Sequence, residues 1–243
     1  MSVQKQVLAF DIYGTILDTG GIAKALQSHV GIDEEKAKQV SLLWRRYQLE
    51  YTWRLNAMEL YEPFNVVTKN ALMHALGEQR IRANDEAIDQ LMNAYNTLTP
   101  FDDAIPALQA LSKLSHVKVL IFSNGTREMV TSALNAASVS SLNDGLYLAD
   151  DQEVKIYKPA KKIYQGLLAK VNEAREDGAG YTGEDVWLVS GNPFDVVGAR
   201  NAGLQAFWVD RAGAGWLDRA SPVKPSTIVR SLSDIVKIVG GER

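Results

Sequence analysis

The sequence contains no cysteine and few histidines. Without cysteine, disulfide bonds, zinc–thiolate sites and cysteine nucleophiles are excluded. The three histidines, His29, His74 and His116, are far apart in the chain and lack the spacing of metal ligands. The sequence therefore indicates neither a histidine metal cluster nor a serine–histidine catalytic pair.

Runs of basic residues and long apolar runs are also absent. The formal net charge is −3, and binding to nucleic acid requires clustered cations, so we expect no nucleic-acid partner. No apolar stretch approaches the roughly 20 residues that span a bilayer, so we expect no membrane insertion. These absences favour a cytoplasmic enzyme or binding domain whose partner is a small molecule.

The residues that are present are typical of a globular α/β protein. The chain has 243 residues, of which 46% are hydrophobic and 23% are charged. Short continuous apolar runs, which are typical of strands buried on both faces, occur at residues 7–10, 117–122, 186–190 and 205–209. They alternate with helical periodicity, and this alternation predicts a parallel sheet covered by helices.

A long helical stretch separates the first two apolar runs. Helical patterns cover residues 22–30, 34–60, 66–76 and 86–98. A single crossover connection does not need this much chain. We therefore predict a helical subdomain, residues 17–97, inserted after the first strand of a core that is formed by residues 1–16 and 98–243.

Polar side chains follow the predicted strands. Ligands of open parallel sheets bind at the carboxyl ends of the strands, so these side chains are the candidates for a functional site. They are Asp11 after the first strand, Ser123 and Asn124 after the second, and Ser190, Asn192 and Asp195 at the third. Lys158, in the loop "KIYKP", is a further candidate.

Four segments carry a family resemblance that spans nearly the whole chain. In order, "FDIYGT", "SNGT", "KIYKP" and "VSGNPFDVVGARNAG" resemble the four motifs of the haloacid dehalogenase superfamily. The inserted stretch "LLWRRYQLEYTW" is similar to the cap of the L-2-haloacid dehalogenase branch. The resemblance implies a Rossmann-like core with a helical cap, in agreement with the organisation predicted from the periodicity.

Two positions differ from the phosphatases of this superfamily. The phosphatases carry a general acid where this chain has Tyr13, and an acid that holds Mg²⁺ where this chain has Gly191. A halide leaves without a proton, and a 2-haloacid is only a monoanion, so dehalogenation requires neither group. The resemblance therefore implies an enzyme without metal or other cofactor.

The resemblance implies hydrolysis of an L-2-haloacid to the D-2-hydroxy acid in two steps. Asp11 is implied as the nucleophile that attacks C2, expels halide with inversion and forms an ester, and water then attacks the Asp11 carbonyl. Lys158 is implied to hold the Asp11 carboxylate as the anion and to be held in turn by Asp195. The residues implied to place or activate the water are Thr15, Ser190, Asn192 and Asp195.

Other residues are implied to bind the substrate or the halide. Ser123 and backbone N–H groups after the first strand suit the substrate carboxylate, whereas Arg45, Asn124 and Phe194 suit the halide. Tyr13 and Tyr164 complete the implied substrate site. The resemblance also implies a homodimer, which the surplus of aromatic residues in the cap supports.

The sequence pattern gives a second reason to select Arg45. Leu42, Leu49 and Trp53 lie on one helical face with it, so Arg45 is predicted to interrupt an apolar stripe and to point into buried space. A buried guanidinium requires an anion. The alternative is an arginine whose stem packs on the cap while its charge reaches solvent.

Simpler interpretations of the motif residues stay open. Asp11 could be a turn acid, Lys158 a solvated loop lysine, and Ser123 and Asn124 helix caps. Two other functions are also compatible with the fold. One is a Mg²⁺-dependent phosphatase, which Tyr13 disfavours, and the other is a catalytically silent protein that binds small carboxylates. Gly191 and Pro193 in "GNPFD" depart from the pattern of the branch and are expected to reshape the halide end of the site.

Overall fold

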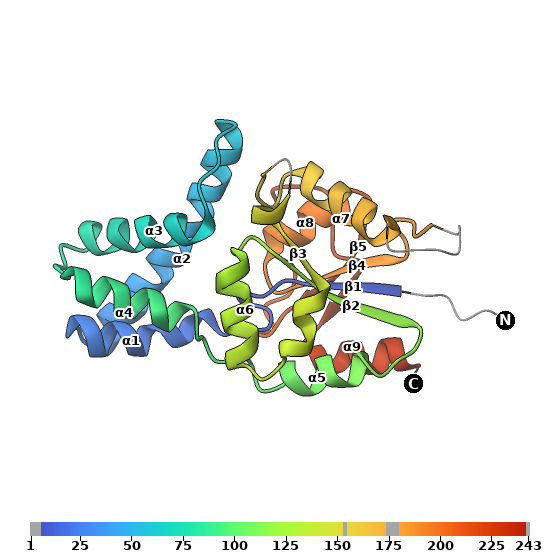
Figure 1. The fold of residues 1–243 in the computed structure, drawn as a ribbon, viewed down its shortest axis with the longest axis horizontal. Coiled ribbons are helices and arrows are strands. Elements are labelled where there is room, and N and C mark those ends of the chain that lie inside the picture. Colours follow the sequence, from blue (N-terminus) through green and yellow to red (C-terminus); the bar gives the residue numbers. More distant parts are fainter. Residues whose placement is uncertain (1–5, 153–154, 174–179, 242–243) are drawn as a thin grey trace.

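The computed structural model describes residues 6–152, 155–173 and 180–241. Within this part of the chain, parallel strands form one sheet in the order β3-β2-β1-β4-β5-β6 (Figure 1). The strands are β1 (Gln6–Phe10), β2 (Val117–Ser123), β3 (Leu146–Leu148), β4 (Val186–Ser190), β5 (Gln205–Val209) and β6 (Thr227–Val229). The predicted α/β fold with a parallel sheet is confirmed. Residues 1–5 and 242–243 of the predicted core lie outside the described residues.

The apolar runs of the sequence correspond to the central strands. The predicted runs coincide with β4 and β5 and differ by one residue from β1 and β2. The sequence did not predict β3 and β6, which are the edge strands and contain three residues each. Such short segments are too brief for a periodic signal.

Helices cover both faces of the sheet. The core helices are α5 (Ala104–Leu111), α6 (Arg127–Ala136), α7 (Lys161–Glu173), α8 (Pro193–Asn201) and α9 (Leu232–Gly240). Figure 1 shows α7 and α8 above the strands and α5 and α9 below them. The central strands β1, β4 and β5 are buried on both sides, which explains their continuous hydrophobicity.

The first four α-helices after β1 form a separate layer beside the sheet, which we call the cap (Figure 1). They are α1 (Ile22–Val30), α2 (Glu34–Ala57), α3 (Phe64–Glu78) and α4 (Asp85–Tyr95). Side-chain caps begin two of them, because Asp33 accepts from the Lys36 N–H at 2.8 Å and Asn84 accepts from the Ala87 N–H at 2.9 Å. All of the cap lies within the predicted insert 17–97, whose boundaries remain a prediction.

The helix α2 ends earlier than its periodic pattern predicts. The pattern continues to residue 60, whereas the helix ends at Ala57. Glu59 has a φ of 56°, a left-handed conformation that an α-helix does not continue through. The turn that follows leads back into α3.

The two chain segments that join the cap to the core lie side by side. The Asp18 N–H donates to the Thr99 carbonyl and the Phe101 N–H donates to the Ile16 carbonyl, both at 2.9 Å. The cap therefore begins and ends at one place, directly after the loop that follows β1. Among the described residues, no helix has both the length and the hydropathy needed to cross a membrane.

Candidate active site

The carboxylate of Asp11 lies at the carboxyl end of β1, where it is 7% exposed. Its Oδ2 accepts from the Thr15 hydroxyl at 2.9 Å and from Asn192 Nδ2 at 2.8 Å. Its Oδ1 faces Lys158 Nζ at 3.2 Å. Donors from three segments of the chain therefore hold the carboxylate in one orientation.

Lys158 connects the two carboxylates of the site. Its ammonium is 1% exposed and donates to Asp11 at 3.2 Å, to Asp195 Oδ2 at 2.8 Å and to the Phe122 carbonyl at 2.8 Å. It also lies 4.0 Å from the centroid of the Phe122 ring, close enough for a cation–π contact. The backbone N–H of Lys158 donates to Asn124 Oδ1 at 3.0 Å. These contacts exclude the solvated loop lysine as an interpretation of Lys158.

Asp195 lies in the first turn of α8 and is completely buried. Tyr164, from α7, donates its hydroxyl to Asp195 Oδ1 at 2.7 Å, while Lys158 contacts the other oxygen. Burial raises the pKa of Asp195 above its ordinary value, and the Lys158 ammonium opposes this rise. Asp195 and Tyr164 are thus linked to Asp11 by hydrogen bonds that pass through Lys158.

Asn192, the N-cap residue of α8, connects Asp11 to the cap. Its Nδ2 donates to Asp11 and, at 2.9 Å, to the Tyr13 carbonyl, while its Oδ1 accepts from Arg45 Nη2 at 3.3 Å. Ser190 Oγ accepts from the Asn192 N–H at 3.1 Å. The side-chain amide therefore has one orientation that satisfies all of its contacts.

Arg45 reaches the site from α2, but the apolar stripe predicted for it is wrong. Leu42 is 74% exposed and Trp53 is 40% exposed, so these residues do not form the buried face. The buried face of α2 includes several polar residues and consists of Ala37, Val40, Ser41, Trp44, Gln48 and Thr52. A hydrophobicity pattern cannot detect a face of this composition. Arg45 lies at its edge, and its Nη2 also donates to the Tyr13 carbonyl at 3.3 Å.

Tyr13, two residues after Asp11, lies buried against the cap. Its ring packs against Tyr95 at 5.3 Å and Phe64 at 5.9 Å between centroids. Burial raises the pKa of the Tyr13 hydroxyl well above its ordinary value, so the group stays neutral. The hydroxyl has no hydrogen-bond partner among the described residues. A tyrosine in this environment is a poor proton donor for a leaving alcohol.

The remaining predicted residues lie around this centre. Ser123, at the end of β2, accepts from the Gly125 N–H at 3.0 Å, which leaves its own hydroxyl proton for another acceptor. Phe194 packs edge-on against Trp53 of the cap, with 5.5 Å between ring centroids. Of the predicted residues, direct hydrogen bonds to Asp11 come from Thr15, Lys158 and Asn192.

A metal site of the phosphatase kind does not fit the residues present. A Cβ at Gly191 would lie 2.3 Å from the Gly14 carbonyl oxygen, so the backbone leaves no room there for an acidic side chain. Among the described residues, no group of three or more histidine or acidic side chains is arranged to hold a metal ion. We therefore derive no step through a metal.

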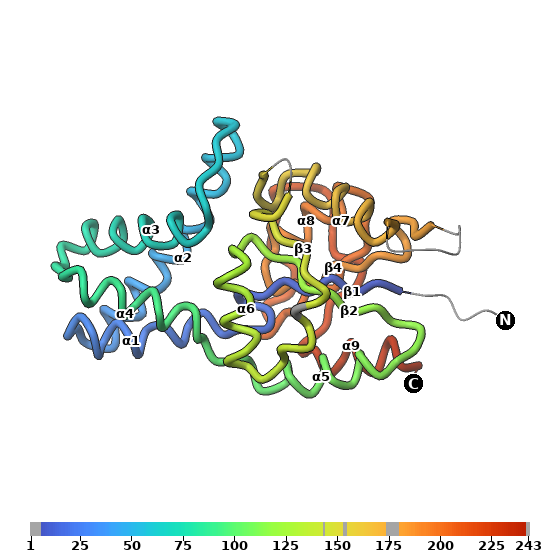
Figure 2. Tube along the Cα trace, in the orientation of Figure 1, coloured from blue at the N-terminus to red at the C-terminus, as the bar shows by residue number. Residues whose placement is uncertain are grey.

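The cap also contacts the Lys158 loop directly. Asn56, near the end of α2, donates to the Tyr157 carbonyl at 2.7 Å and accepts from the Tyr157 N–H at 2.9 Å. Tyr61 donates to Asp150 at 2.7 Å. Figure 2 shows the segment between α2 and α3 reaching toward this part of the core. The cap thus holds the residue that precedes Lys158.

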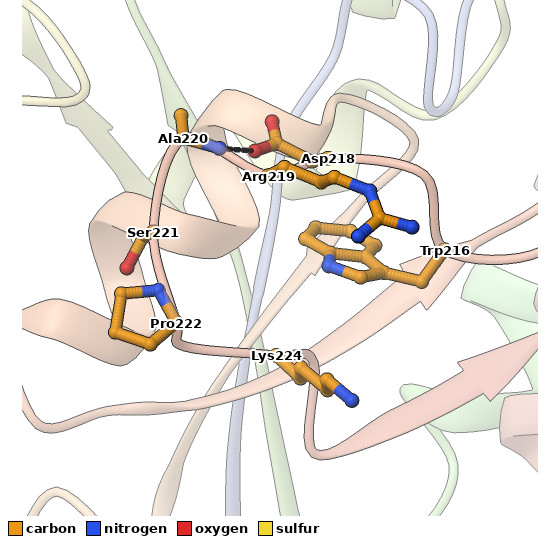
Figure 3. Close-up of a pocket in the computed structure, with 7 residues that line it drawn as sticks. All are labelled: Trp216, Asp218, Arg219, Ala220, Ser221, Pro222 and Lys224. Carbon is orange, nitrogen blue, oxygen red and sulfur yellow. Dashed lines mark hydrogen bonds between the residues drawn. The ribbon is translucent and has the colours of Figure 1, made fainter.

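A surface cavity of about 370 Å³ lies elsewhere, in the loop between β5 and β6 (Figure 3). It is lined by Trp216, Asp218, Arg219, Ala220, Ser221, Pro222 and Lys224. None of these is a predicted site residue. The chemistry of Asp11 is therefore separate from this cavity.

Sequence reasoning did not identify Gln48, which accepts from Arg45, or Thr68 and Tyr95, which bond to Gln48 inside the cap. Gln48 is three residues from Arg45 on the same helix, a spacing at which side chains meet. That spacing was the available signal. Thr68 and Tyr95 come from other helices, and no local pattern brings them to Arg45.

A capped α/β protein with a buried, oriented carboxylate at the carboxyl ends of its strands is the class of protein that this fold and site define. Comparison with known families makes the assignment specific. The profile of the haloacid dehalogenase-like hydrolases matches residues 5–203, and the chain belongs to this family.

Relatives and solved structures resemble nearly the whole chain. The (S)-2-haloacid dehalogenase 4A of Burkholderia cepacia is 34% identical over 226 residues, which cover 93% of this chain and 91% of the relative. Haloacetate dehalogenase H-2 of Moraxella sp. (strain B) is 31% identical over 208 residues, which cover 86% of this chain and 87% of that relative. The L-2-haloacid dehalogenase of Xanthobacter autotrophicus with chloropropionic acid covalently bound has a TM-score of 0.83 at 26% identity, covering 99% of this chain and 100% of that structure.

Proposed function

We propose that this protein hydrolyses (S)-2-haloacids, which are L-2-haloacids, to D-2-hydroxy acids. The observation that carries the proposal is the Asp11 centre, a buried carboxylate that Lys158, Thr15 and Asn192 orient. Tyr13 and Gly191 stand where a phosphatase needs acids. The similarity to (S)-2-haloacid dehalogenases at 34% and 30% identity supports the choice of substrate.

In the first step, a carboxylate oxygen of Asp11 attacks C2 of the haloacid. The new C–O bond forms as the carbon–halogen bond breaks, and the halide leaves with the electron pair, so inversion at C2 gives the D configuration. Holding both reactants in line can lower the barrier by about 7–11 kcal/mol. The hydrogen bonds that fix the orientation of Asp11 align one of these two reactants.

Arg45 and Ser123 are proposed to bind the two ends of the substrate. The Ser123 hydroxyl and backbone N–H groups after β1 suit the carboxylate, and they do so without placing a cation that would compete for Asp11. Arg45 provides the positive charge at the halide end, beside Asn192. Phe194 and Asn124 are proposed to border the halide.

In the second step, water attacks the Asp11 carbonyl carbon and releases the hydroxy acid. The oxygen that Asp11 gave to the substrate leaves with the product, and the oxygen of water enters Asp11. One proton is released. Thr15, Ser190, Asn192 and Asp195 are proposed to place or activate this water. Tyr164 and Asp195 hold Lys158 in position through both steps.

The reaction is proposed to need no metal. Halide departure requires no proton, and the closeness of Gly191 to the Gly14 carbonyl leaves no space for a further carboxylate ligand. Chelator-treated protein is therefore expected to release chloride from (S)-2-chloropropionate and not from the (R) enantiomer. The variant Asp11→Asn is expected to fold and to release none. Magnesium-dependent hydrolysis of a phosphate ester, without chloride release, would instead identify a phosphatase.

We further propose that two copies of the chain associate through the cap. Large apolar side chains are exposed on and beside α2 and α3, at Leu42, Met58, Leu60, Val66 and Met73. Large apolar side chains that a protein exposes are candidates for burial at an interface, and these lie on or beside two helices of the cap. Size-exclusion chromatography with light scattering should give the mass of a dimer, and a monomer at micromolar concentration would refute the proposal.

A further inference from the structure

The guanidinium of Arg45 is held by neutral oxygen atoms. Nη2 donates to the Tyr13 carbonyl and to Asn192 Oδ1, both at 3.3 Å. The shortest contact is from Nη1 to Gln48 Oε1, at 2.6 Å. These partners orient the cation, but none of them carries a charge that cancels it.

Gln48 can adopt only one orientation of its amide. Its side chain is completely buried in the cap. Its Nε2 faces Thr68 Oγ1 at 2.7 Å, and the Thr68 hydroxyl donates its only proton to the Phe64 carbonyl at 2.6 Å. Thr68 must therefore accept from Gln48, which places the amide nitrogen toward Thr68 and the oxygen toward Arg45.

A second donor reinforces this orientation. The Tyr95 hydroxyl donates to Gln48 Oε1 at 2.9 Å, so the oxygen accepts from both Tyr95 and Arg45. Packing fixes Tyr95, because its ring lies 5.2 Å from that of Trp44 and 5.3 Å from that of Tyr13. The Trp44 indole N–H in turn donates to the Thr68 carbonyl at 2.8 Å. The amide oxygen of Gln48 is therefore held in place before any substrate binds.

We propose that Gln48 is a positioning residue that fixes Arg45 through a neutral acceptor and so keeps its positive charge available for the departing halide. The inference rests on the proposed dehalogenase function. A carboxylate at this place would offer an equally good acceptor, but it would form an ion pair with Arg45. The charge of Arg45 would then be balanced by the carboxylate and would stabilise the departing halide less.

The variants Gln48→Glu and Gln48→Met separate charge from orientation. Gln48→Glu keeps the length and the acceptor and adds a negative charge, whereas Gln48→Met keeps the length and removes both hydrogen-bonding groups. Gln39→Glu is the matched control, because it makes the same change at an exposed position of the same helix. Circular dichroism and thermal unfolding establish that each variant is folded.

The readout is pre-steady-state formation of the Asp11 ester, together with inhibition by bromide. Gln48→Glu should slow ester formation about a hundredfold, as loss of one aligned charge interaction does. Ester hydrolysis should change little, and the bromide inhibition constant should rise at least about tenfold. The loss should be larger for 2-chloropropionate than for 2-bromopropionate, because chloride is the poorer leaving group. Gln48→Met should lose about tenfold in ester formation.

The results that overturn the proposal are specific. Wild-type ester formation and bromide inhibition in Gln48→Glu would show that the acceptor need not be neutral. Equal losses in Gln48→Glu and Gln48→Met, or an equal loss in Gln39→Glu, would remove the role of charge. If Gln48→Glu does not fold, an unchanged bromide constant in Gln48→Met overturns the positioning role. Absence of halide release by the wild-type protein would instead refute the proposed function, so the two failures are distinguishable.

Discussion

Replacing Lys158 by methionine should destabilise the fold as well as abolish turnover. The substitution keeps the length of the side chain but leaves two buried carboxylates, Asp11 and Asp195, without their common cation. Removing one partner of a buried ion pair costs about 3–5 kcal/mol of unfolding free energy. For a chain of this size, that loss lowers the melting temperature by about 6–20 °C.

The unfolding free energy that Lys158→Met loses should depend on pH in a defined direction. Burial already raises the pKa of Asp195, and removing Lys158 removes the charge that opposes this rise. A group whose pKa is higher in the folded than in the unfolded state destabilises the fold at pH values above the folded pKa, and proton uptake relieves the cost as the pH falls. The difference between Lys158→Met and wild type should therefore be largest at neutral and alkaline pH and should shrink in acid.

Urea denaturation at several pH values measures this difference. Lys162→Met, an exposed position of the same segment, is the matched control and should stay within about 0.5 kcal/mol of wild type. The double variant Lys158→Met/Asp195→Asn should recover part of the loss, because one of the unpaired charges is removed. A deficit below about 1 kcal/mol, or one that is constant from about pH 8 to about pH 5, would refute the reasoning.

Other substitutions test separate parts of the site. Arg45→Ala should slow ester formation about a hundredfold or more in rapid-quench experiments, and an unchanged rate would reassign Arg45 to structure. Gly191→Ala should lower the unfolding free energy by about 1–3 kcal/mol, because its Cβ would lie 2.3 Å from the Gly14 carbonyl oxygen; wild-type stability in urea would contradict that contact. Asn56→Ala should cost about 1–3 kcal/mol in the same assay, since it leaves the Tyr157 N–H unpaired and removes one of the donors to the Tyr157 carbonyl, and no loss would mean that the cap contact contributes nothing.

The sequence predicted the central sheet well and placed Asp11 at the carboxyl end of its first strand, whereas the role of Asp11 as the nucleophile stays a prediction. Continuous apolar runs identify buried parallel strands, and the ends of those strands must meet at one edge, so Asp11, Ser123 and Asn192 could be placed from sequence alone. The edge strands β3 and β6 could not, because three residues carry no periodic signal. The assignment of Lys158 depended on the family resemblance, since its loop has no distinctive local pattern.

The interior of the cap was the least predictable region. The expected apolar stripe around Arg45 was wrong because Gln48 and Thr52, which are polar, occupy the buried face of α2 while Leu42 is exposed. Gln48 is buried there because it bonds to Arg45 on its own helix and to Thr68 and Tyr95 on other helices, whereas Thr52 donates to the Leu49 carbonyl. Such long-range pairing is invisible to a pattern that follows one helix at a time.

The ester at Asp11 is the central claim, and isotope transfer in a single turnover tests it most directly. Enzyme in excess would be mixed with (S)-2-chloropropionate in water enriched in ¹⁸O, and both the product and the peptide that contains Asp11 would be analysed by mass spectrometry. We predict unlabelled D-lactate and one ¹⁸O atom in the Asp11 carboxylate. Labelled lactate with an unlabelled Asp11 would mean that water attacks C2 itself, and it would contradict the account.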